Sequence, residues 1–234
     1  MVTRGKNYLE KAKLVEAGKK YLPVEAVALV KKTSMTKFDG TVNLSIKLDI
    51  DPKRSDQQVR GTVNLPGGSG KKKIVVVIAK GEKIKEAEAA GADFAGGDDL
   101  IEKISKGWTD FDITIATPDV MASVGKLGKV LGQKGLMPNP KTGTVTFDVG
   151  KIVKEFKSGK VEYKTDKTGV IHVPIGKISF GDDKIGSNLQ SVIEVVTKAK
   201  PSSVKGVFIK SVALSATMGP SIKVDISKIL ENAN

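Results

Sequence analysis

The hydrophobic pattern of this chain changes twice, and these changes limit the folds open to it. From residue 41 to residue 50 apolar and polar side chains alternate, which is the period of a strand with one buried face. After the flexible stretch Pro66–Gly70, residues 74–79 form an unbroken apolar run, as in a strand covered on both faces. Alternation returns after Gly159. Residues 66–159 are therefore predicted to be an insertion into a domain that both ends of the chain build.

Inside the insertion, apolar segments alternate with helical patterns. The segments at 74–79, around Phe94 and at 112–116 read as strands, and Thr117-Pro118-Asp119 combines a cap, a first-turn proline and an acid that favour the start of a helix. Such alternation favours a small parallel or mixed sheet with helices packed on it. Helices are predicted over residues 82–90, 98–107, 117–131 and 148–158.

The outer segments combine amphipathic helices with alternating strands. The strongest helical pattern is 182–200, whose apolar stripe is ended by Pro201. Other helices are predicted at 6–20 and from Pro23, and strands at 41–50, 59–65, 161–164, 170–173, 177–180 and 206–215. Asp166 and Gly169 lie between two of these strands, where a tight hairpin turn requires such residues.

The charge of the chain indicates a polyanionic partner. It carries 39 basic and 26 acidic side chains, a formal net charge of +13. Residues 1–65 and 160–234 together hold 24 basic and 14 acidic side chains, or +10, whereas the insertion holds 15 and 12, or +3. Aromatic residues make up only 5% of the chain, which argues against RNA recognition by base stacking on a sheet. Nucleic acid is the expected partner.

Several classes of site and location are excluded or disfavoured. The absence of cysteine excludes disulfides, thiolate catalysis and Cys-ligated zinc. The first residues lack the apolar core of a signal peptide and no later run approaches membrane-spanning length, so a cytoplasmic protein is expected. The single histidine, His172, lies in a predicted strand, where a structural role is expected over a catalytic one.

Nucleotide-binding motifs are incomplete despite the α/β pattern of the insertion. Leu65 stands where a phosphate-binding loop needs its first glycine, and Lys72 stands where it needs Ser or Thr. Lys73 replaces the third glycine of a dinucleotide fingerprint. No cofactor is expected.

Residues 211–220 read as a strand that runs into a turn, Thr217-Met218-Gly219-Pro220. By residue type alone this turn is either an ordinary connection or a binding site. Gly219 is expected to allow a close backbone approach or to supply a positive φ, and Pro220 to end strand pairing. Phe38 is likewise open, as a core residue or a surface one. Lys53, Arg54 and Arg60 fit phosphate contacts and solvated loop charges equally well.

Three stretches identify a resemblance. D-P-K-R-S-D-Q-Q-V-R-G at 51–61, L-M-P-N-P-K at 136–141 and the Thr217-Met218-Gly219 turn resemble the L-one family of large-subunit ribosomal proteins, which build the mobile side stalk of the ribosome. Family members often carry Pro-Arg where this chain has Gln133-Lys134, so the charge survives but the bidentate grip of Arg on phosphate does not. The loop at 132–144 is either a rigid connector or a direct RNA contact.

The resemblance implies an RNA-binding surface. The residues that it places there are Lys37, Phe38, Thr41, Asp166, Lys167, Thr168, Gly169, Ser211, Thr217, Met218 and Gly219. It also implies that the three segments around 37–38, 166–169 and 217–219 sit together beside one sheet. With the patterns above, it predicts an α/β (α+β) protein with a discontinuous, rRNA-binding α/β sandwich domain from residues 1–65 and 160–234, and an inserted Rossmann-like three-layer α/β domain from 66–159.

The function that follows from the resemblance is structural, not catalytic. It implies a protein that is a monomer when free, binds the stalk region of large-subunit rRNA, helps to release tRNA from the exit site and can repress its own operon mRNA. Two alternatives stay open at this point. One is an RNA-binding regulator outside the ribosome, and the other is an α/β enzyme acting on a nucleotide, which would need a base, a nucleophile or a metal cluster.

Overall fold

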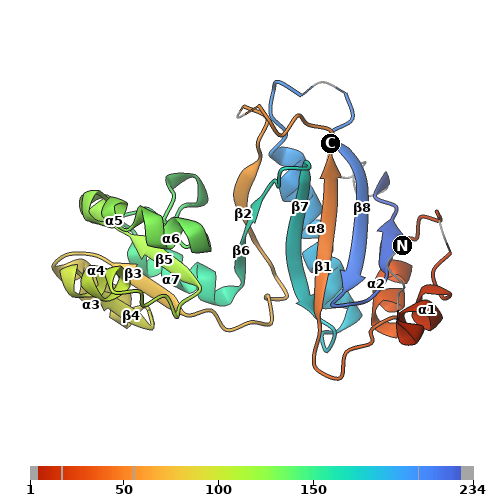
Figure 1. The fold of residues 1–234 in the computed structure, drawn as a ribbon, viewed down its shortest axis with the longest axis horizontal. Helices are drawn as coiled ribbons and strands as arrows, with labels where there is room; N and C mark the ends of the chain where they lie inside the picture. The colour runs from red at the N-terminus through yellow and green to blue at the C-terminus, as the bar shows by residue number, and fades with distance from the viewer. Residues whose placement is uncertain (1–4, 17, 55, 205, 228–234) are drawn as a thin grey trace. The chain divides into compact units, whose positions relative to one another are not determined.

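The computed structural model describes residues 5–16, 18–54, 56–204 and 206–227 (Figure 1). The protein is a mixed α/β fold, as predicted. Its chain divides into two compact units, one from residues 1–70 and 161–234 (unit 1) and one from residues 71–160 (unit 2). Each unit has a hydrophobic core of its own.

Unit 1 is organised around a four-stranded sheet in the order β7-β1-β8-β9. Its strands are β1 (Thr41–Leu48), β7 (Val170–Lys177), β8 (Ile209–Ala216) and β9 (Ser221–Val224). Every pair in the sheet is antiparallel. Figure 1 shows β1 flanked by β7 and β8. Because every second residue of β1 is buried, one face of the sheet forms the core and the other does not.

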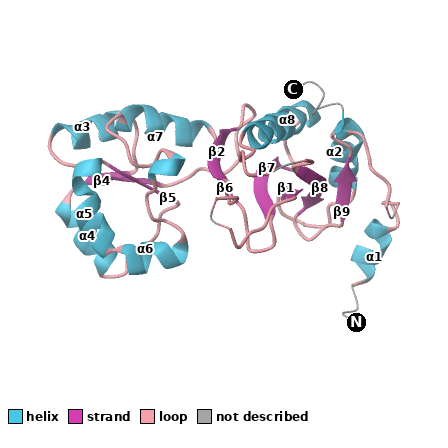
Figure 2. Cartoon of the chain, turned by 90° about the horizontal axis from the view of Figure 1, so that it is seen from above, coloured by secondary structure: helices cyan, strands magenta, loops and turns pink. Residues whose placement is uncertain are grey.

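Among the residues that the structure describes, helices pack on one face of this sheet. α2 (Pro23–Lys32) and α8 (Asp182–Lys198) pack on the buried side, where their apolar stripes join the sheet in one core (Figure 2). The apolar stripe of α8 contributes Ile185, Leu189, Val192, Ile193 and Val196, all with less than 2% exposure, as its periodicity predicts. The remaining elements of unit 1 are α1 (Lys6–Ala12) and a two-stranded pair, β2 (Arg60–Asn64) with β6 (Lys160–Lys164).

Two predictions for unit 1 are wrong, and one strand was not predicted. The helix predicted over 6–20 ends at Ala12; farther along, Gly18 takes a φ of +86° and Tyr21 pairs as an isolated bridge with Val224, so the helix cannot continue to residue 20. The strand predicted at 177–180 is a turn closed by the bond from the Phe180 N–H to the Lys177 carbonyl. Pro220 is unpaired, as expected, but the strand that follows it, β9, was not predicted; β9 pairs with β8.

Unit 2 is a parallel three-stranded sheet in the order β4-β3-β5 with helices on both faces (Figure 2). Val75 and Val77 pack on one helical layer, while Val76 and Ile78 pack on the other, so the unbroken apolar run is buried on both sides as predicted. The strands are β3 (Val75–Ile78), β4 (Phe94–Gly96) and β5 (Ile113–Ala116); α3 (Glu82–Ala89) and α7 (Val149–Ser158) form one layer, and α4 (Asp98–Ser105), α5 (Met121–Lys126) and α6 (Gly128–Lys134) the other.

The single helix predicted over 117–131 is broken into three short pieces. A 3-10 turn, η1 (Pro118–Val120), precedes α5, and α5 is separated from α6 at Leu127. The Leu127 N–H bonds to the carbonyl of Val124 three residues back, so the α-helical ladder is interrupted there. A second 3-10 turn, η2 (Pro140–Thr142), lies in the loop that leads to α7.

Candidate nucleic-acid interface

Within the described part of the chain, no helix packs on the second face of the unit 1 sheet. On that face, strand alternation and register bring together partly or fully exposed side chains from all four strands. We call this set the open face: Asn43, Ser45, Lys47, His172, Pro174, Ser211, Ala213, Ser215, Ser221 and Lys223. Its members are small, polar or cationic, and none is acidic. A shallow surface of this kind suits the wide minor groove of A-form RNA, which displays 2′-hydroxyls and is flanked by phosphates.

The turn between β8 and β9 closes one end of the open face. The Gly219 N–H donates to the Ala216 carbonyl at 2.9 Å, so residues 216–219 form a β-turn. Met218 has a φ of +62°, the left-handed region that a side chain seldom adopts, and it is 74% exposed. Gly219, expected to allow a close backbone approach or to supply a positive φ, does not have a positive φ. A Cβ there would lie in ordinary van der Waals contact, 3.4 Å from the Ala216 carbonyl oxygen and 3.5 Å from that of Thr33, so the backbone passes close by without excluding a side chain. The residue in the costly conformation is the methionine.

Thr217 ties this turn to the start of β1. Its hydroxyl accepts a hydrogen bond from the Thr41 N–H at 3.0 Å and contacts the Thr41 carbonyl oxygen at 3.2 Å. The Thr217 N–H also donates to that carbonyl at 3.0 Å. The hydroxyl thus completes the β1–β8 ladder where regular pairing ends.

The segment before β1 lies at the same end. Phe38 is 64% exposed, which excludes the alternative that it fills the core, and Lys37 is exposed beside it. Asp39 is held by Ser179, whose hydroxyl and N–H donate to its carboxylate at 2.7 and 3.1 Å. The hydroxyl bond from Ser179 is the main reason why the pKa of Asp39 lies below its usual value. The Lys177 ammonium donates to the Thr41 hydroxyl at 3.1 Å.

The turn between β6 and β7 closes the opposite end of the open face. The Asp166 carboxylate accepts bonds from the Thr168 and Val170 N–H groups, each at 2.8 Å, and from the Thr168 hydroxyl. The bond from the Val170 N–H is the leading cause that lowers the pKa of Asp166 below its usual value. Gly169 supplies the positive φ, +75°, that the turn requires. The acid therefore holds the turn, which explains an anionic side chain on a surface expected to face a polyanion.

Side chains of the open face connect with this second turn. Lys47 donates to the Thr168 carbonyl, and Ser211 is the register partner of Lys47 on β8. Ser45 Oγ lies 3.0 Å from His172 Nδ1, while His172 Nε2 lies 3.7 Å from the Asp166 carboxylate. The longer distance is not a hydrogen bond, so these three side chains do not form a hydrolytic triad.

The predicted site residues fall into two groups and do not form one cluster. Lys37, Phe38, Thr41 and the 217–219 turn lie at the start of β1, whereas Gly169 bonds to Leu48 at its end. An eight-residue strand spans roughly 23 Å at ~3.3 Å per residue. The expectation that the three segments sit together is therefore wrong. The reason is topological: β7 and β8 both run antiparallel to β1, so the turn that enters β7 and the turn that leaves β8 lie at opposite ends.

The residues that the sequence prediction missed lie between those two groups. Asn43, Ser45, Lys47, Ser215 and Lys223 connect the two ends across the open face. The alternation in β1 already marked its polar members as solvent-facing, but only the register shows that they share a face with the polar members of β8 and β9.

Hydrogen bonds and ion pairs bear on two alternatives that the sequence left open, the role of Arg60 and the role of the loop at 132–144. Arg60 Nη2 lies 2.6 Å from the Glu162 carboxylate, so its charge serves the β2–β6 pair. In the loop at 132–144, the Asn139 N–H donates to the Thr144 hydroxyl at 2.7 Å and the Asn139 side chain accepts from the Lys141 N–H at 2.9 Å. Such internal bonds are those of a rigid connector. Lys53 and Arg54 are exposed.

Neither a metal site nor a membrane span is found in the described part of the chain. Within residues 5–16, 18–54, 56–204 and 206–227, no three His, Asp or Glu side chains gather as metal ligands would. Over the same ranges, no helix is both long and apolar enough to cross a bilayer.

Comparison with known protein families agrees with the surface described above. A family model described as the ribosomal protein L1p/L10e family matches residues 30–220. That range includes β1, β7 and β8, the turns at both ends of the open face, and all of unit 2. The chain therefore belongs to the ribosomal protein L1p/L10e family, a family of RNA-binding ribosomal proteins of the large subunit.

Proposed function

We propose that the open face of unit 1 binds the stalk region of large-subunit rRNA, with unit 1 as the rRNA-binding domain and unit 2 as an inserted domain. The single observation that carries the proposal is the asymmetry of the sheet. α2 and α8 cover one face, while the strand residues of the open face are small, polar or cationic. Such a surface can approach an RNA backbone closely without burying an unpaired charge.

Each end of the open face offers a different kind of contact. At the first end, Phe38 and Met218 are exposed apolar side chains that can cover ribose faces, and Lys37 can neutralise phosphate. At the second end, Lys167 is an exposed cation beside the turn that Asp166 holds. Ser45, Ser211 and Ser215 lie between them, where hydroxyls can bond to 2′-hydroxyl and phosphate oxygens. The spacing of the two ends favours an extended, folded RNA over a short single strand.

The finer roles follow from this interface. A protein held on the mobile stalk can contact deacylated tRNA at the exit site and assist its release. When it is free in the cytoplasm as a monomer, it can bind its own operon mRNA through the same open face and repress translation. Residues 1–65 and 160–234, which make up nearly all of unit 1, carry +10 against +3 for residues 66–159, and this supports placing the rRNA and the operon mRNA on unit 1.

Hydroxyl-radical footprinting on isolated large-subunit rRNA tests the proposal. We expect protection confined to the stalk region. Ser215→Asp, which places a carboxylate on the open face, should weaken binding by at least about tenfold. Ser187→Asp is the matched control, because Ser187 is exposed on α8, on the covered side of the sheet. Equal loss in both variants, or protection outside the stalk, would refute the proposed face.

Competition between the two RNAs tests the regulatory role. If the operon mRNA uses the open face, unlabelled stalk rRNA should displace it completely, and Ser215→Asp should lose both ligands together. Sedimentation with large subunits separates a ribosomal protein from a free regulator. A protein that binds its mRNA in the presence of saturating stalk rRNA would contradict a shared site.

A further inference from the structure

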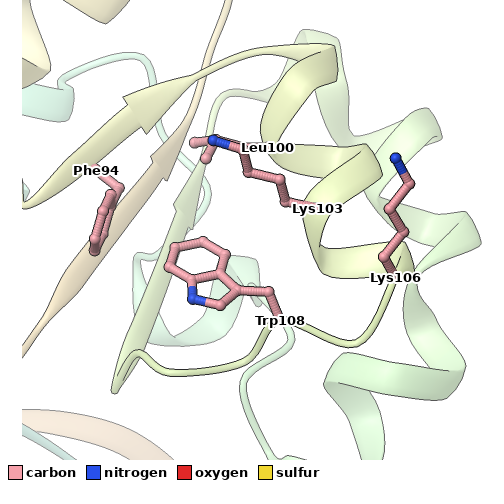
Figure 3. Close-up of a pocket in the computed structure, with 5 residues that line it drawn as sticks. All are labelled: Phe94, Leu100, Lys103, Lys106 and Trp108. Carbon is pink, nitrogen blue, oxygen red and sulfur yellow. The ribbon is translucent and has the colours of Figure 1, made fainter.

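Unit 2 contains an aromatic pocket that the rRNA interface does not use. Its lining residues are Phe94, Leu100, Lys103, Lys106 and Trp108, around a cavity of about 500 Å³ (Figure 3). All of them come from β4, α4 and the segment that follows α4. The volume lies within the range of sites that take small organic ligands, roughly 300–1,000 Å³.

A helix-ending motif builds this pocket. The Gly107 N–H bonds to the Ile104 carbonyl at 2.9 Å, and the Trp108 N–H bonds to the Lys103 carbonyl at 3.2 Å. These are the two bonds of a Schellman motif, and Gly107 supplies its left-handed residue with a φ of +101°. The motif turns the chain back on α4 and brings Trp108 beside Lys103. The position of the indole is therefore set by backbone hydrogen bonds.

The aromatic rings of the pocket remain partly open. Phe94 and Trp108 meet edge to face, with ring centroids 4.9 Å apart and an interplanar angle of 82°. Phe111 supports the indole from the core, at 5.3 Å between centroids. Phe94 is 43% exposed, which is unusual for a phenylalanine, and an edge-to-face pair leaves a broad ring face without a ring stacked on it. The indole Nε1–H of Trp108, unlike its backbone N–H, has no hydrogen-bond partner within the described part of the chain.

Two lysines line the pocket. Lys103 extends along it from α4, whereas Lys106, where α4 ends, directs its ammonium away from the rings of Phe94 and Trp108 (Figure 3). Lys106 lies 3.9 Å from the Glu102 carboxylate, but both side chains are more than 70% exposed, so this pair holds the cation weakly. Lys103 has no carboxylate within 4.0 Å among the described residues. Of the three acids of α4, Asp98 and Asp99 lie in its first turn, at the other end of the helix, and Glu102 is the one that lies near Lys106.

We propose that this pocket binds a nucleotide, with the base stacked on Phe94 or Trp108 and the phosphate held by Lys103, while Lys106 adds positive charge nearby. Stacking on an aromatic face accepts every base, and lysines hold phosphate as point charges, so the site should show little base preference. The indole Nε1–H of Trp108 can donate to the base or ribose. An unstacked nucleotide of single-stranded RNA and a free nucleoside monophosphate share this chemistry. The inference does not rest on the rRNA interface of unit 1.

The pocket carries its own reporter, because Trp108 is the only tryptophan of the chain. Base stacking on an indole quenches its fluorescence, so titration of the full-length protein with oligo(rA)5 or with AMP measures binding at this residue. N-acetyltryptophanamide corrects for collisional quenching. Saturable quenching by oligo(rA)5 alone would assign the site to single-stranded RNA, and saturation by AMP as well would assign it to free nucleotides; both support the proposal.

Substitutions then test the two contacts separately. Phe94→Ala should weaken binding by about tenfold through the loss of a stacking face, and Lys103→Ala by a smaller factor with a reduced dependence on salt. Lys154→Ala is the matched control, since Lys154 is exposed on α7 in the opposite helical layer. Should Phe94→Ala not fold, Lys103→Ala still tests the site.

Three results would overturn the inference. The first is quenching by both ligands that never exceeds that of N-acetyltryptophanamide. The second is equal loss in Lys103→Ala and Lys154→Ala, which would indicate general attraction to a basic protein. The third is saturation by an acidic peptide containing tyrosine or phenylalanine but by neither nucleotide ligand, which would make the pocket a peptide site. Ser215→Asp should leave the quenching unchanged, so failure of the rRNA interface and failure of this pocket are distinguishable.

Discussion

Thr217→Val tests whether the Thr217 hydroxyl stabilises the end of the sheet in addition to any contact that it makes with RNA. In the wild-type protein this hydroxyl is the acceptor for the Thr41 N–H at the first residue of β1. Valine has nearly the same shape, so packing is retained while the acceptor is lost. The Thr41 carbonyl keeps its bond from the Thr217 N–H, which leaves one backbone donor without a partner. Thr217→Ser restores the hydroxyl and serves as the control.

The magnitude follows from the position of Thr41. An unsatisfied buried N–H costs about 1–3 kcal/mol, and partial exposure of Thr41 allows water to recover some of that cost. We therefore expect local opening of the β1–β8 end to become easier by about 1–2 kcal/mol. At constant intrinsic exchange, this corresponds to roughly 5- to 30-fold faster amide exchange.

Hydrogen exchange is the suitable assay, because a chain with two separate units has no single unfolding midpoint. Exchange should accelerate in a peptide covering residues 38–44 and stay unchanged in α8 and throughout unit 2. If Thr217→Val exchanges like the wild type, or if Thr217→Ser accelerates as much as Thr217→Val, the hydroxyl does not support β1. Thr217→Val is also expected to lower the affinity for stalk rRNA. The part of this loss that the easier opening does not explain measures the direct contact of Thr217 with RNA.

Three further predictions concern the turns at the two ends of the open face. The pKa of Asp166 is lowered chiefly by the hydrogen bond from the Val170 N–H. The carboxylate therefore stabilises the turn fully above the usual pKa of 3.8, and this stabilisation is lost as the pH falls through the lower folded-state pKa. Amide exchange at Val170 should accelerate over that acidic range in the wild type, and Asp166→Asn should abolish this pH dependence. Lys167→Ala should lower the slope of log affinity for rRNA against log salt concentration by just under about one unit, whereas Lys198→Ala on α8 should leave this slope unchanged. Identical slopes in the wild type and both variants would show that Lys167 is not part of the interface. Met218→Gly relieves a left-handed backbone conformation that costs roughly 1 kcal/mol, and the greater freedom of glycine in the unfolded chain offsets part of this gain. Urea denaturation should therefore show equal or higher stability, while the affinity for rRNA falls. A clear loss of stability would show that the methionine side chain holds the turn.

Much of the architecture could be read from local patterns. The alternation from Thr41 onward predicts a strand with one buried face, and the unbroken run in residues 75–78 predicts one buried on both faces; both are confirmed by burial. The apolar stripe of α8 is confirmed as well. These features were predictable because the burial of side chains every two or three to four residues leaves a periodic trace in the sequence.

Other features had no such trace. The left-handed φ lies at Met218 and not at the adjacent glycine, because the β8–β9 pairing sets which residue of the turn must reverse the chain. The bridge between Tyr21 and Val224, which follows α1, joins positions about two hundred apart in the sequence. The Phe94–Trp108 pocket likewise joins a strand to the end of the following helix; the pattern marked Phe94 only as part of a strand and did not mark Trp108.

By itself, the sequence determined the mixed α/β class, the faces of the main strands and of α8, and the excess of positive charge in the outer segments, because each of these depends on residue type and on spacing along the chain. The family resemblance could also be found from the sequence alone, because it depends on short runs of residues. Only the tertiary structure decided that the candidate RNA contacts form two groups at opposite ends of one sheet, with unforeseen serines and lysines between them. The physical reason is that strand order and register arise from long-range packing, and no local pattern records which strands become neighbours.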